Sequence, residues 1–325
     1  MEIRPLDLDN DSAMAEAYRI ECAANQSVRP GWISPNKEAR ILGWRTPNGW
    51  QNHLLGAWNG TTLIGFAAGM HSPDTPDTTW IFVWVDPVHQ NAGVGSALAR
   101  AAEDAGPAST ARFVASAIRS SSVELDALMQ NFAFPLGYSP ATTETVVELD
   151  LRDAQLAGPT TAPGYEISTH VNGVPERFRE QVGQIKGLVD AEAPNGELGW
   201  GETPVSPDEY AAEMDLWIAQ GSTVFESIAV DAAGNVTAWT CLVVDADTER
   251  PAHIEGTLVV SGHRGHGLGA AVKLASLHRA VELGNVRTVR TSSDDGNVWM
   301  RSINTRLGFT PVETEIILQK ETISP

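Results

Sequence analysis

Short apolar runs and amphipathic segments alternate along the chain, a pattern that predicts strands alternating with helices. Two pairs of apolar runs are joined through an asparagine and a glycine, at Asn59-Gly60 and Gly234-Asn235, which indicates two β-hairpins. Each hairpin is followed by one more apolar strand, a glycine-rich turn and a helix. The pattern therefore predicts an α/β fold in which one order of elements occurs twice.

The bounds of the elements follow from the same pattern. In the first half we predict strands at residues 1–8, 53–58, 61–70, 78–85, 111–118 and 145–151, and helices at 13–24, 96–105 and one that runs through 131. Residues 29–50 are expected to form a loop-rich insert. In the second half we predict strands at 165–171, 223–230, 236–244, 253–260, 286–291 and 313–318, and helices at 175–191, 206–219, 268–283 and 297–306.

The two halves repeat at a nearly constant offset. Gly93 and Gly267 lie 174 positions apart, and so do Gly95 and Gly269. A period this long indicates a duplicated domain, because solenoid repeats run to roughly 20–50 residues. We therefore predict one domain at residues 1–151, a linker at 152–164 and a second domain at 165–325.

The composition agrees with two globular domains. The chain has 325 residues, of which 42% are hydrophobic and 19% charged, enough to form buried cores. The formal net charge is −19, which disfavours nucleic acid and anionic membranes as partners. An acidic surface suits a cationic amine as substrate, although it also serves solubility alone.

The two cysteines are Cys22 and Cys241, too few and too far apart for a disulfide framework or a Cys-x-x-Cys metal site. No metal is expected. The first residues lack the apolar core of a signal peptide, and no apolar run of about 18 residues is present. We therefore expect a cytoplasmic protein.

Each glycine-rich turn has the features of an anion site. The first glycine turn (residues 90–95) and the second (residues 264–269) both follow a strand and precede a helix, so backbone N–H groups meet the positive end of a helix dipole. The spacing is [Gln/Arg]-x-x-Gly-x-Gly, and each turn lies past the middle of its domain. Neither a dinucleotide fingerprint nor a Walker motif fits, although a pyrophosphate does.

These turns resemble motif A of the GNAT superfamily of N-acetyltransferases. The matching segments are Val85-Asp-Pro-Val-His-Gln-Asn-Ala-Gly-Val-Gly-Ser96 and Val259-Val-Ser-Gly-His-Arg-Gly-His-Gly-Leu-Gly-Ala270, and the tail Asn297-Val-Trp-Met-Arg-Ser-Ile-Asn-Thr-Arg-Leu-Gly-Phe309 also matches. The resemblance covers nearly the whole chain and is closer in the second half. It implies two tandem GNAT domains, each a mixed, mostly antiparallel sheet flanked by helices, similar in layout to two-domain acetyltransferases of the mycothiol synthase type.

The resemblance also implies acetyl-CoA as cosubstrate and a set of residues that bind it. In the second domain these are Leu258, Val259, Val260, Arg264, Gly265, His266, Gly267, Leu268, Gly269, Ala270 and Asn297. In the first domain they are Val83, Trp84, Val85, Gln90, Asn91, Ala92, Gly93, Val94, Gly95 and Ser96. Asn91 replaces the glycine found at position 265, and asparagine adopts a left-handed backbone less freely than glycine.

Transfer to an amine requires that the amine lose its proton. In the superfamily that the chain resembles, a carboxylate or imidazole on the strand before the turn is a frequent base, and His253 and Glu255 are the candidates there. Residues two apart on a strand share a face, so these two and Thr257 are expected to point the same way. The alternative is that His253 and Glu255 are solvated at the start of the strand. No acid lies at 78–85, which argues against the same base in the first domain.

Many members of the superfamily carry a tyrosine four residues before the tail glycine, as a general acid. Asn304 and Ala133 stand at that position here. Tyr210 is an alternative acid, or a residue on a helix surface. Asp294 and Asp295 either attract a cationic amine or belong to a turn.

We therefore expect an acetyl-CoA-dependent N-acetyltransferase that acts on a primary amine of a small molecule, with the second domain catalytic. The alternatives are a catalytically silent protein that binds acetyl-CoA or acts as a scaffold, and an acetyltransferase of protein N-termini or lysines. The protein is expected to be a monomer or a homodimer.

Overall fold

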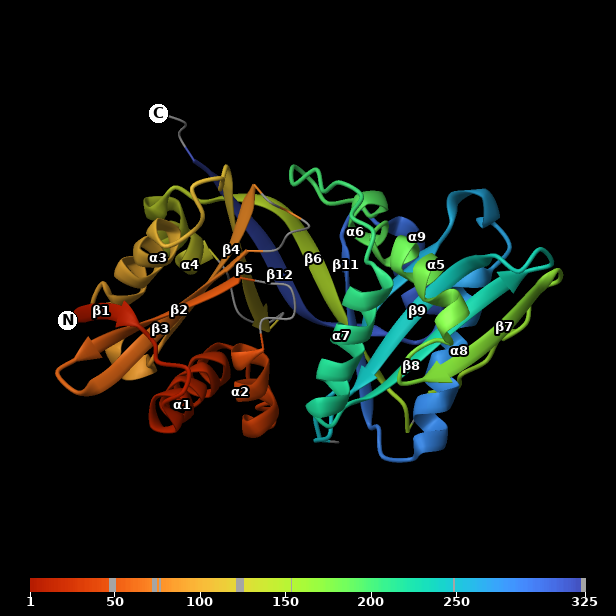
Figure 1. Ribbon diagram of the computed structural model, residues 1–325, viewed down its shortest axis with the longest axis horizontal. Helices are drawn as coiled ribbons and strands as arrows, with labels where there is room; N and C mark the ends of the chain where they lie inside the picture. The colour runs from red at the N-terminus through yellow and green to blue at the C-terminus, as the bar shows by residue number, and fades with distance from the viewer. Residues whose placement is uncertain are drawn as a thin grey trace. The chain divides into compact units, whose positions relative to one another are not determined.

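A computed structural model describes residues 1–46, 51–71, 75, 77–120, 126–152, 154–247 and 249–322 (Figure 1). The chain forms two compact units. Unit 1 comprises Met1–Glu144, Gly196–Leu198 and Glu313–Pro325, and unit 2 comprises Thr145–Asn195 and Gly199–Val312. Each unit is a mixed α/β domain with helices against a mostly antiparallel sheet, which confirms the predicted fold class.

Unit 1 has the strand order β1-β2-β3-β4-β5-β12. The strands are β1 (Glu2–Pro5), β2 (Gln51–Asn59), β3 (Thr62–His71), β4 (Thr78–Val85), β5 (Arg112–Ser120) and β12 (Thr310–Glu321). The helices are α1 (Asp11–Val28), α2 (Lys37–Arg45), α3 (Val94–Asp104) and α4 (Asp126–Leu128), the last continued by a π-helical turn, Met129–Ala133, and a 3-10 turn, Phe134–Leu136. The range 29–50, predicted as a loop-rich insert, contains the helix α2, and its residues 47–50 lie outside the described residues. The N-cap of α2, Asn36, accepts a hydrogen bond from the backbone of Ala39 at 2.9 Å.

The two faces of the unit 1 sheet carry different helices, because successive side chains on a strand point to opposite faces. On β3, Phe66 and Ala68 pack with α1 in one core. Ala67 packs on the other face, in the core that contains Leu98 of α3. The glycine turn between β4 and α3 is therefore held by a buried strand on one side and a buried helix on the other.

Unit 2 has the strand order β6-β11-β10-β9-β8-β7. The strands are β6 (Ser139–Asp150), β7 (Tyr165–Val171), β8 (Thr223–Asp231), β9 (Val236–Val244), β10 (Ala252–Val259) and β11 (Thr288–Asp294). The helices are α5 (Glu176–Lys186), α6 (Val189–Glu192), α7 (Pro207–Ala219), α8 (Leu268–Leu283) and α9 (Val298–Arg306). The N-cap of α7 is Ser206, and Glu209 completes it as a capping box.

The central strand of unit 2 is β9, which is buried along its whole length. Its residues alternate between two cores. Cys241 and Val243 pack with α5 and α7, whereas Leu242 and Val244 pack with α8. Cys241 is completely buried and is a residue of this core.

The compact units differ from the division predicted at residues 151 and 165. The strand β12, near the end of the chain, pairs antiparallel with β5 from Glu313↔Ser120 to Glu321↔Arg112 and so belongs to unit 1. Most of β6, from the first half of the chain, belongs to unit 2 beside β11. Each unit is thus completed by a strand from the other half of the sequence.

An ion pair joins β12, the strand that the second half of the sequence contributes to unit 1, to the C-cap of α1. Arg29 donates through both Nε and Nη2 to the carboxylate of Glu313, each at 2.7 Å. The side chains of the pair are 14% and 7% exposed. A bidentate pair of this kind fixes orientation as well as distance, so it specifies where β12 docks.

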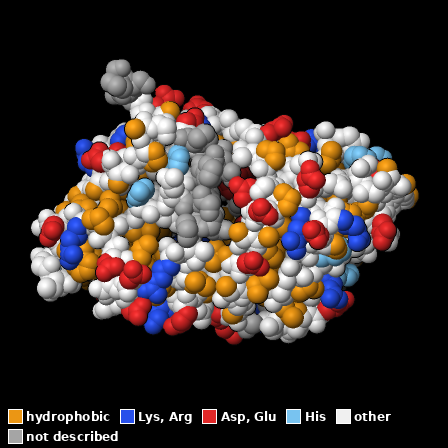
Figure 2. All heavy atoms as spheres, viewed as in Figure 1, with side chains coloured by type: hydrophobic (Ala, Val, Ile, Leu, Met, Phe, Trp, Pro, Cys, Tyr) orange, Lys and Arg blue, Asp and Glu red, His pale blue; other side chains and the backbone are white. Residues whose placement is uncertain are grey.

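Across the described residues, none of the helices combines the length and the apolar character that a membrane crossing requires. Acidic and basic side chains are scattered over the face drawn in Figure 2 and do not gather into one patch of a single sign.

Candidate functional site

The second glycine turn leaves a row of backbone N–H groups uncovered. The strand β10 runs through a 3-10 turn, Ser261–His263, into α8, and Gly267 is the N-cap of that helix. Gly265 and Gly267 have φ of +85° and +75°, a left-handed conformation that favours glycine. A Cβ atom at either position would meet no described heavy atom within 4 Å. The N-terminus of α8 therefore faces open space, where an anion can approach the N–H groups.

The first glycine turn has the same geometry. Gly93 is the N-cap of α3 with φ of +80°, and a Cβ atom there would also meet nothing described within 4 Å. Asn91 adopts the left-handed conformation, with φ of +59°, at the position equivalent to Gly265. The substitution of asparagine for glycine has therefore kept the backbone path of the turn.

The predicted ligands Gln90 and Arg264 have an equivalent structural role. Gln90 Nε2 donates to the carbonyl oxygen of Val85 at 3.3 Å, and Arg264 Nε donates to the carbonyl oxygen of Val259 at 3.2 Å. Each side chain therefore ties the turn back to the last residue of the preceding strand. Arg264 also forms an ion pair with Glu192, so part of its charge is already neutralised.

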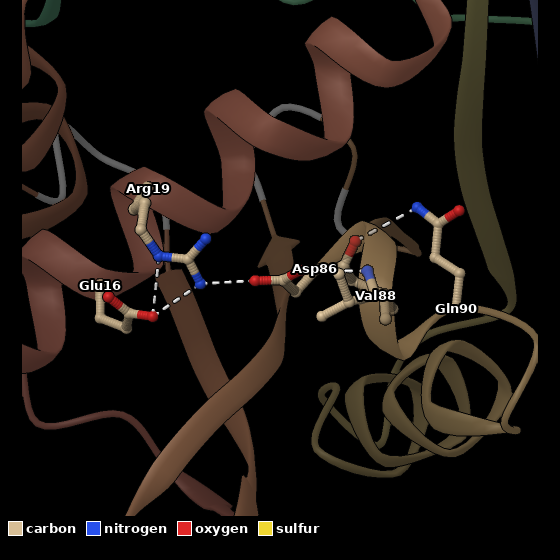
Figure 3. A network of polar contacts seen from close by, with 6 residues as sticks. Glu16, Arg19, Asp86, Val88 and Gln90 are labelled. Carbon is tan, nitrogen blue, oxygen red and sulfur yellow. Dashed lines mark hydrogen bonds and ion pairs between the residues drawn. The ribbon is translucent and has the colours of Figure 1, made fainter.

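The first glycine turn is anchored by a network that the second lacks (Figure 3). Asp86 accepts a hydrogen bond from the backbone N–H of Val88 at 3.1 Å and pairs with Arg19 of α1 at 2.5 Å. Desolvation opposes the charge on Asp86, but Arg19 and the backbone donor outweigh it and lower the pKa of the carboxyl group. The equivalent residue before the second turn is Val260, which packs against an apolar core instead.

Beside each turn, two parallel strands diverge. The strands β10 and β11 pair at Ala252↔Val289 and His253↔Arg290, and the rest of β10 extends beyond this register. In unit 1, β4 and β5 pair from Thr78↔Arg112 to Trp80↔Val114. One edge of each strand that leads into a turn is therefore available to pair with the amide groups of an extended ligand.

A β-bulge at Glu255 distinguishes β10 from its counterpart. Along β9, Ile254 is opposite Leu242 whereas Gly256 is opposite Cys241, so Glu255 is the extra residue. The bulge corrects the expectation that Thr257 shares a face with His253. Thr257 is opposite Thr240, and its hydroxyl lies 2.7 Å from that of Thr240, on the face that Ile254 occupies.

The bulge brings the two predicted catalytic side chains together. His253 Nε2 lies 2.5 Å from Glu255 Oε1, and both side chains are 40% exposed. Desolvation disfavours the charge on each group, but their mutual attraction outweighs it: the pKa of His253 is raised and that of Glu255 is lowered. The pair is therefore accessible to solvent, and each group favours the charged form of the other.

The strand β4 offers no equivalent pair. Its register with β3 runs without a bulge from Gly65↔Val85 to His71↔Thr79. Thr79 is buried, with its hydroxyl 2.8 Å from that of Thr110, and Ile81 lies in the apolar core. The two glycine turns are thus alike, but an acid–base pair precedes only the second of them in the described strands.

The remaining predicted residues have structural partners. Asn297 caps α9, accepting a hydrogen bond from the backbone N–H of Met300 at 3.1 Å. Asp294 accepts from the backbone of Gly296 at 2.7 Å, and Asp295 accepts from the hydroxyl of Thr145 at 2.6 Å. Both aspartates are therefore part of the turn before α9.

Two further candidates are buried. Tyr210 is completely buried and donates a hydrogen bond to Glu226, which corrects its placement on a helix surface. Asn304 is 2% exposed and accepts a hydrogen bond from Lys273. The burial of Lys273 could not be predicted from the sequence, because a lysine in an amphipathic helix is typical of the solvated face.

Comparison with known proteins gives a family match across both halves. The sequence matches the model of the acetyltransferase (GNAT) family over residues 15–134 and 192–309. No match was found among curated proteins. A solved tandem GNAT protein from the clavulanic acid biosynthesis pathway has a TM-score of 0.82 at 22% identity, over 100% of this chain and 99% of that chain. A GCN5-related N-acetyltransferase from Sphaerobacter thermophilus has a TM-score of 0.66 at 18% identity, over 98% and 95%.

Proposed function

Because this chain belongs to the acetyltransferase (GNAT) family, we propose that it transfers an acetyl group from acetyl-CoA to a primary amine of a small molecule. The family supports acetyl transfer in general, and the donor and the acceptor are our proposal. The observation that supports it most is the combination of three features along β10 and the turn that follows. These are an open glycine turn, a strand edge that is not paired with β11 beyond His253, and the His253–Glu255 pair.

The residues of unit 2 fit acetyl-CoA. The open space above Gly265 and Gly267 leaves room for a pyrophosphate on the N–H groups at the start of α8. The edge of β10 at Leu258 and Val259, beyond the register with β11, suits the amides of the pantetheine arm. When bound, acetyl-CoA would supply an acetyl group activated as a thioester.

The His253–Glu255 pair would remove the proton from the acceptor. An amine in water near neutral pH is mostly protonated and must lose a proton before it is nucleophilic. Glu255, ionised through its lowered pKa, would attract and orient the ammonium group. His253, once neutral above its raised pKa, would accept the proton. We assign catalysis to unit 2. Unit 1 would bind the donor, but its strand β4 has no pair equivalent to His253 and Glu255.

Replacing Gly267 with glutamate tests both the donor and the choice of unit. The new carboxylate would enter the open space above the turn and repel a pyrophosphate, so acetyl-CoA affinity at this turn and turnover are expected to fall at least about 100-fold. Gly93→Glu in unit 1 is expected to leave turnover nearly unchanged. Calorimetry with acetyl-CoA and an assay over a panel of small amines measure the two effects.

Gly234→Glu is the matched control, because Gly234 also has positive φ, +87°, and open space around its Cβ position, but lies in the hairpin between β8 and β9. It introduces the same charge and backbone strain away from the turn. If Gly93→Glu alone abolishes turnover, the assignment of catalysis to unit 2 is wrong.

A catalytically silent acetyl-CoA-binding protein is the second candidate. Asn304, at the position where many relatives have a tyrosine, is buried against Lys273 and has no acidic hydroxyl. Tight acetyl-CoA binding without turnover of any amine in the panel would favour this alternative. Turnover that depends on His253 would exclude it.

A further inference from the structure

A buried lysine and a buried asparagine form an unusual pair in unit 2. Lys273 on α8 is 1% exposed and Asn304 on α9 is 2% exposed. Lys273 Nζ donates to Asn304 Oδ1 at 2.6 Å, and its other contacts are Met300 Sδ at 3.5 Å and the ring of Phe309 at 5.7 Å. Among the described residues none provides a carboxylate as counter-ion to Lys273.

The lysine fixes the orientation of the asparagine amide. A lysine ammonium group only donates hydrogen bonds, so the amide must turn its oxygen toward Nζ. The amide nitrogen of Asn304 then points away from Lys273, and although it is buried it has no hydrogen-bond partner in the described part of the chain. A buried donor without a partner is destabilising, which indicates that an acceptor from outside the chain completes it.

The asparagine lines a small pocket. This pocket has a volume of about 70 Å³ and lies among α9, β6 and β11. Ser293, Thr305 and Arg301 give it polar walls, whereas Val147 and Phe309 give it apolar ones. None of the described lining residues is acidic, and Arg301 is the charged residue among them. Behind the lining residues lie the amine of Lys273, at Asn304, and the carboxylate of Asp295, at Thr145.

Asp294 and Asp295, which follow the lining residue Ser293 in the sequence, both accept hydrogen bonds. Asp295 accepts a hydrogen bond from Thr145 at the pocket wall, and Asp294 accepts one from the backbone of Gly296. Arg301 donates to the backbone carbonyl of Asp295 at 2.9 Å, which does not neutralise its charge. The pocket therefore combines positive charge, donors and a short apolar wall.

We propose that this pocket binds a short-chain carboxylate, with one oxygen accepting from Asn304 Nδ2 and the hydrocarbon against Val147 and Phe309. The volume holds only a few water molecules, which limits the ligand to roughly two to four carbons. The carboxylate would supply the negative charge that no described residue provides to Lys273.

Ligand binding should also be linked to protonation. Burial lowers the pKa of Lys273 to about 7, and no charged neighbour contributes to this shift. A carboxylate nearby favours the charged amine, so the bound ligand raises this pKa and a proton is taken up. Affinity is therefore expected to be higher at pH 6 than at pH 8.5.

Thermal unfolding of the full chain tests the proposal, with sodium acetate and sodium butyrate as probes. Chloride at equal ionic strength and acetamide serve as controls. We expect either carboxylate at 100 mM to raise the Tm by about 2 °C at pH 6, with saturation, and acetamide to have less effect. Equal Tm values in acetate, butyrate, acetamide and chloride would overturn the proposal.

Asn304→Asp is the decisive variant because it keeps the shape of the side chain. The new carboxylate would pair with Lys273 and repel the ligand, so the carboxylate-dependent rise in Tm should disappear. Ser302→Asp, at an exposed position of the same helix, adds the same charge outside the pocket and should keep the rise. A rise that persists in Asn304→Asp would place the carboxylate elsewhere and contradict the proposal.

Discussion

Replacing His253 with asparagine is expected to lower kcat for acetyl transfer by about 10²–10⁴-fold, the usual contribution of a general base. His253 lies 2.5 Å from Glu255, is 40% exposed and is on the bulged strand that leads into the second glycine turn. Asparagine is polar and of similar size, but cannot take up a proton at neutral pH. Steady-state kinetics with the best amine of the panel, together with acetyl-CoA calorimetry, separate loss of the base from loss of donor binding.

The pH profile is a more specific test of the pair. Because Glu255 raises the pKa of His253, kcat/KM is expected to increase with pH through an apparent pKa above 6.5. In Glu255→Gln the attraction is lost and desolvation remains, so this pKa should fall below 6.5 while the plateau rate also decreases. The two groups titrate as a coupled pair, so the apparent value belongs to both.

His170→Asn is the matched control. His170 lies on β7 of the same unit, within 3.0 Å of the hydroxyl of Ser168. Its replacement should leave both kcat and the pH profile unchanged. A wild-type profile that does not change when Glu255 becomes glutamine would show that the pair is not the base.

Replacing Lys273 with methionine is expected to remove most of the dependence of stability on pH between 7 and 10. Burial lowers the pKa of Lys273 from 10.5 to about 7, so in this window the unfolded chain binds the proton that the folded chain has released. Wild-type stability therefore rises with pH across the window, by about 4 kcal/mol in total. Below about pH 7 the full cost of burying the charge is present.

At pH 6 the methionine variant should be the more stable protein. Removing the buried charge gains about 4 kcal/mol, and leaving Asn304 Oδ1 without a donor loses about 1–3 kcal/mol. Urea unfolding at several pH values measures both effects. If the stabilities of wild type and variant remain parallel from pH 6 to 10, Lys273 does not titrate in this window.

Lys186→Met provides a control of opposite sign. Burial disfavours the charge of Lys186, but its ion pair with Glu213 outweighs burial and raises the pKa. Its contribution is therefore present throughout pH 6–10 and is lost only above the ordinary lysine pKa. Methionine at 186 should destabilise the protein by a similar amount across the whole window.

Most of the elements could be predicted from local patterns. The helix expected at 268–283 is present as Leu268–Leu283, and both hairpins occur where an asparagine and a glycine predicted them. The helix α2, inside the insert at 29–50, is the main element that the sequence pattern does not predict. It is short, and the indole of its Trp44 packs against Phe66, which is remote in sequence. Local periodicity over nine residues is too weak to indicate such a helix.

The chemistry of the candidate site was harder to predict. His253 and Glu255 could be named as a pair, but Thr257 was placed on their face because a β-bulge has no reliable sequence signal. The burial of Lys273 could not be predicted from the sequence either, since it depends on contacts of α8 with α9 and with Phe309.

The sequence by itself determined the two glycine turns, their separation of 174 residues and the duplicated order of elements. These features are local: a left-handed backbone, a helix start and an apolar alternation depend on neighbouring residues. Only the tertiary structure decided that β12 completes unit 1 and that the second turn alone follows a described acid–base pair brought together by a bulge. It also decided that Lys273 is buried without a counter-ion among the described residues. These depend on pairing and burial between residues far apart in the chain, which local patterns do not record.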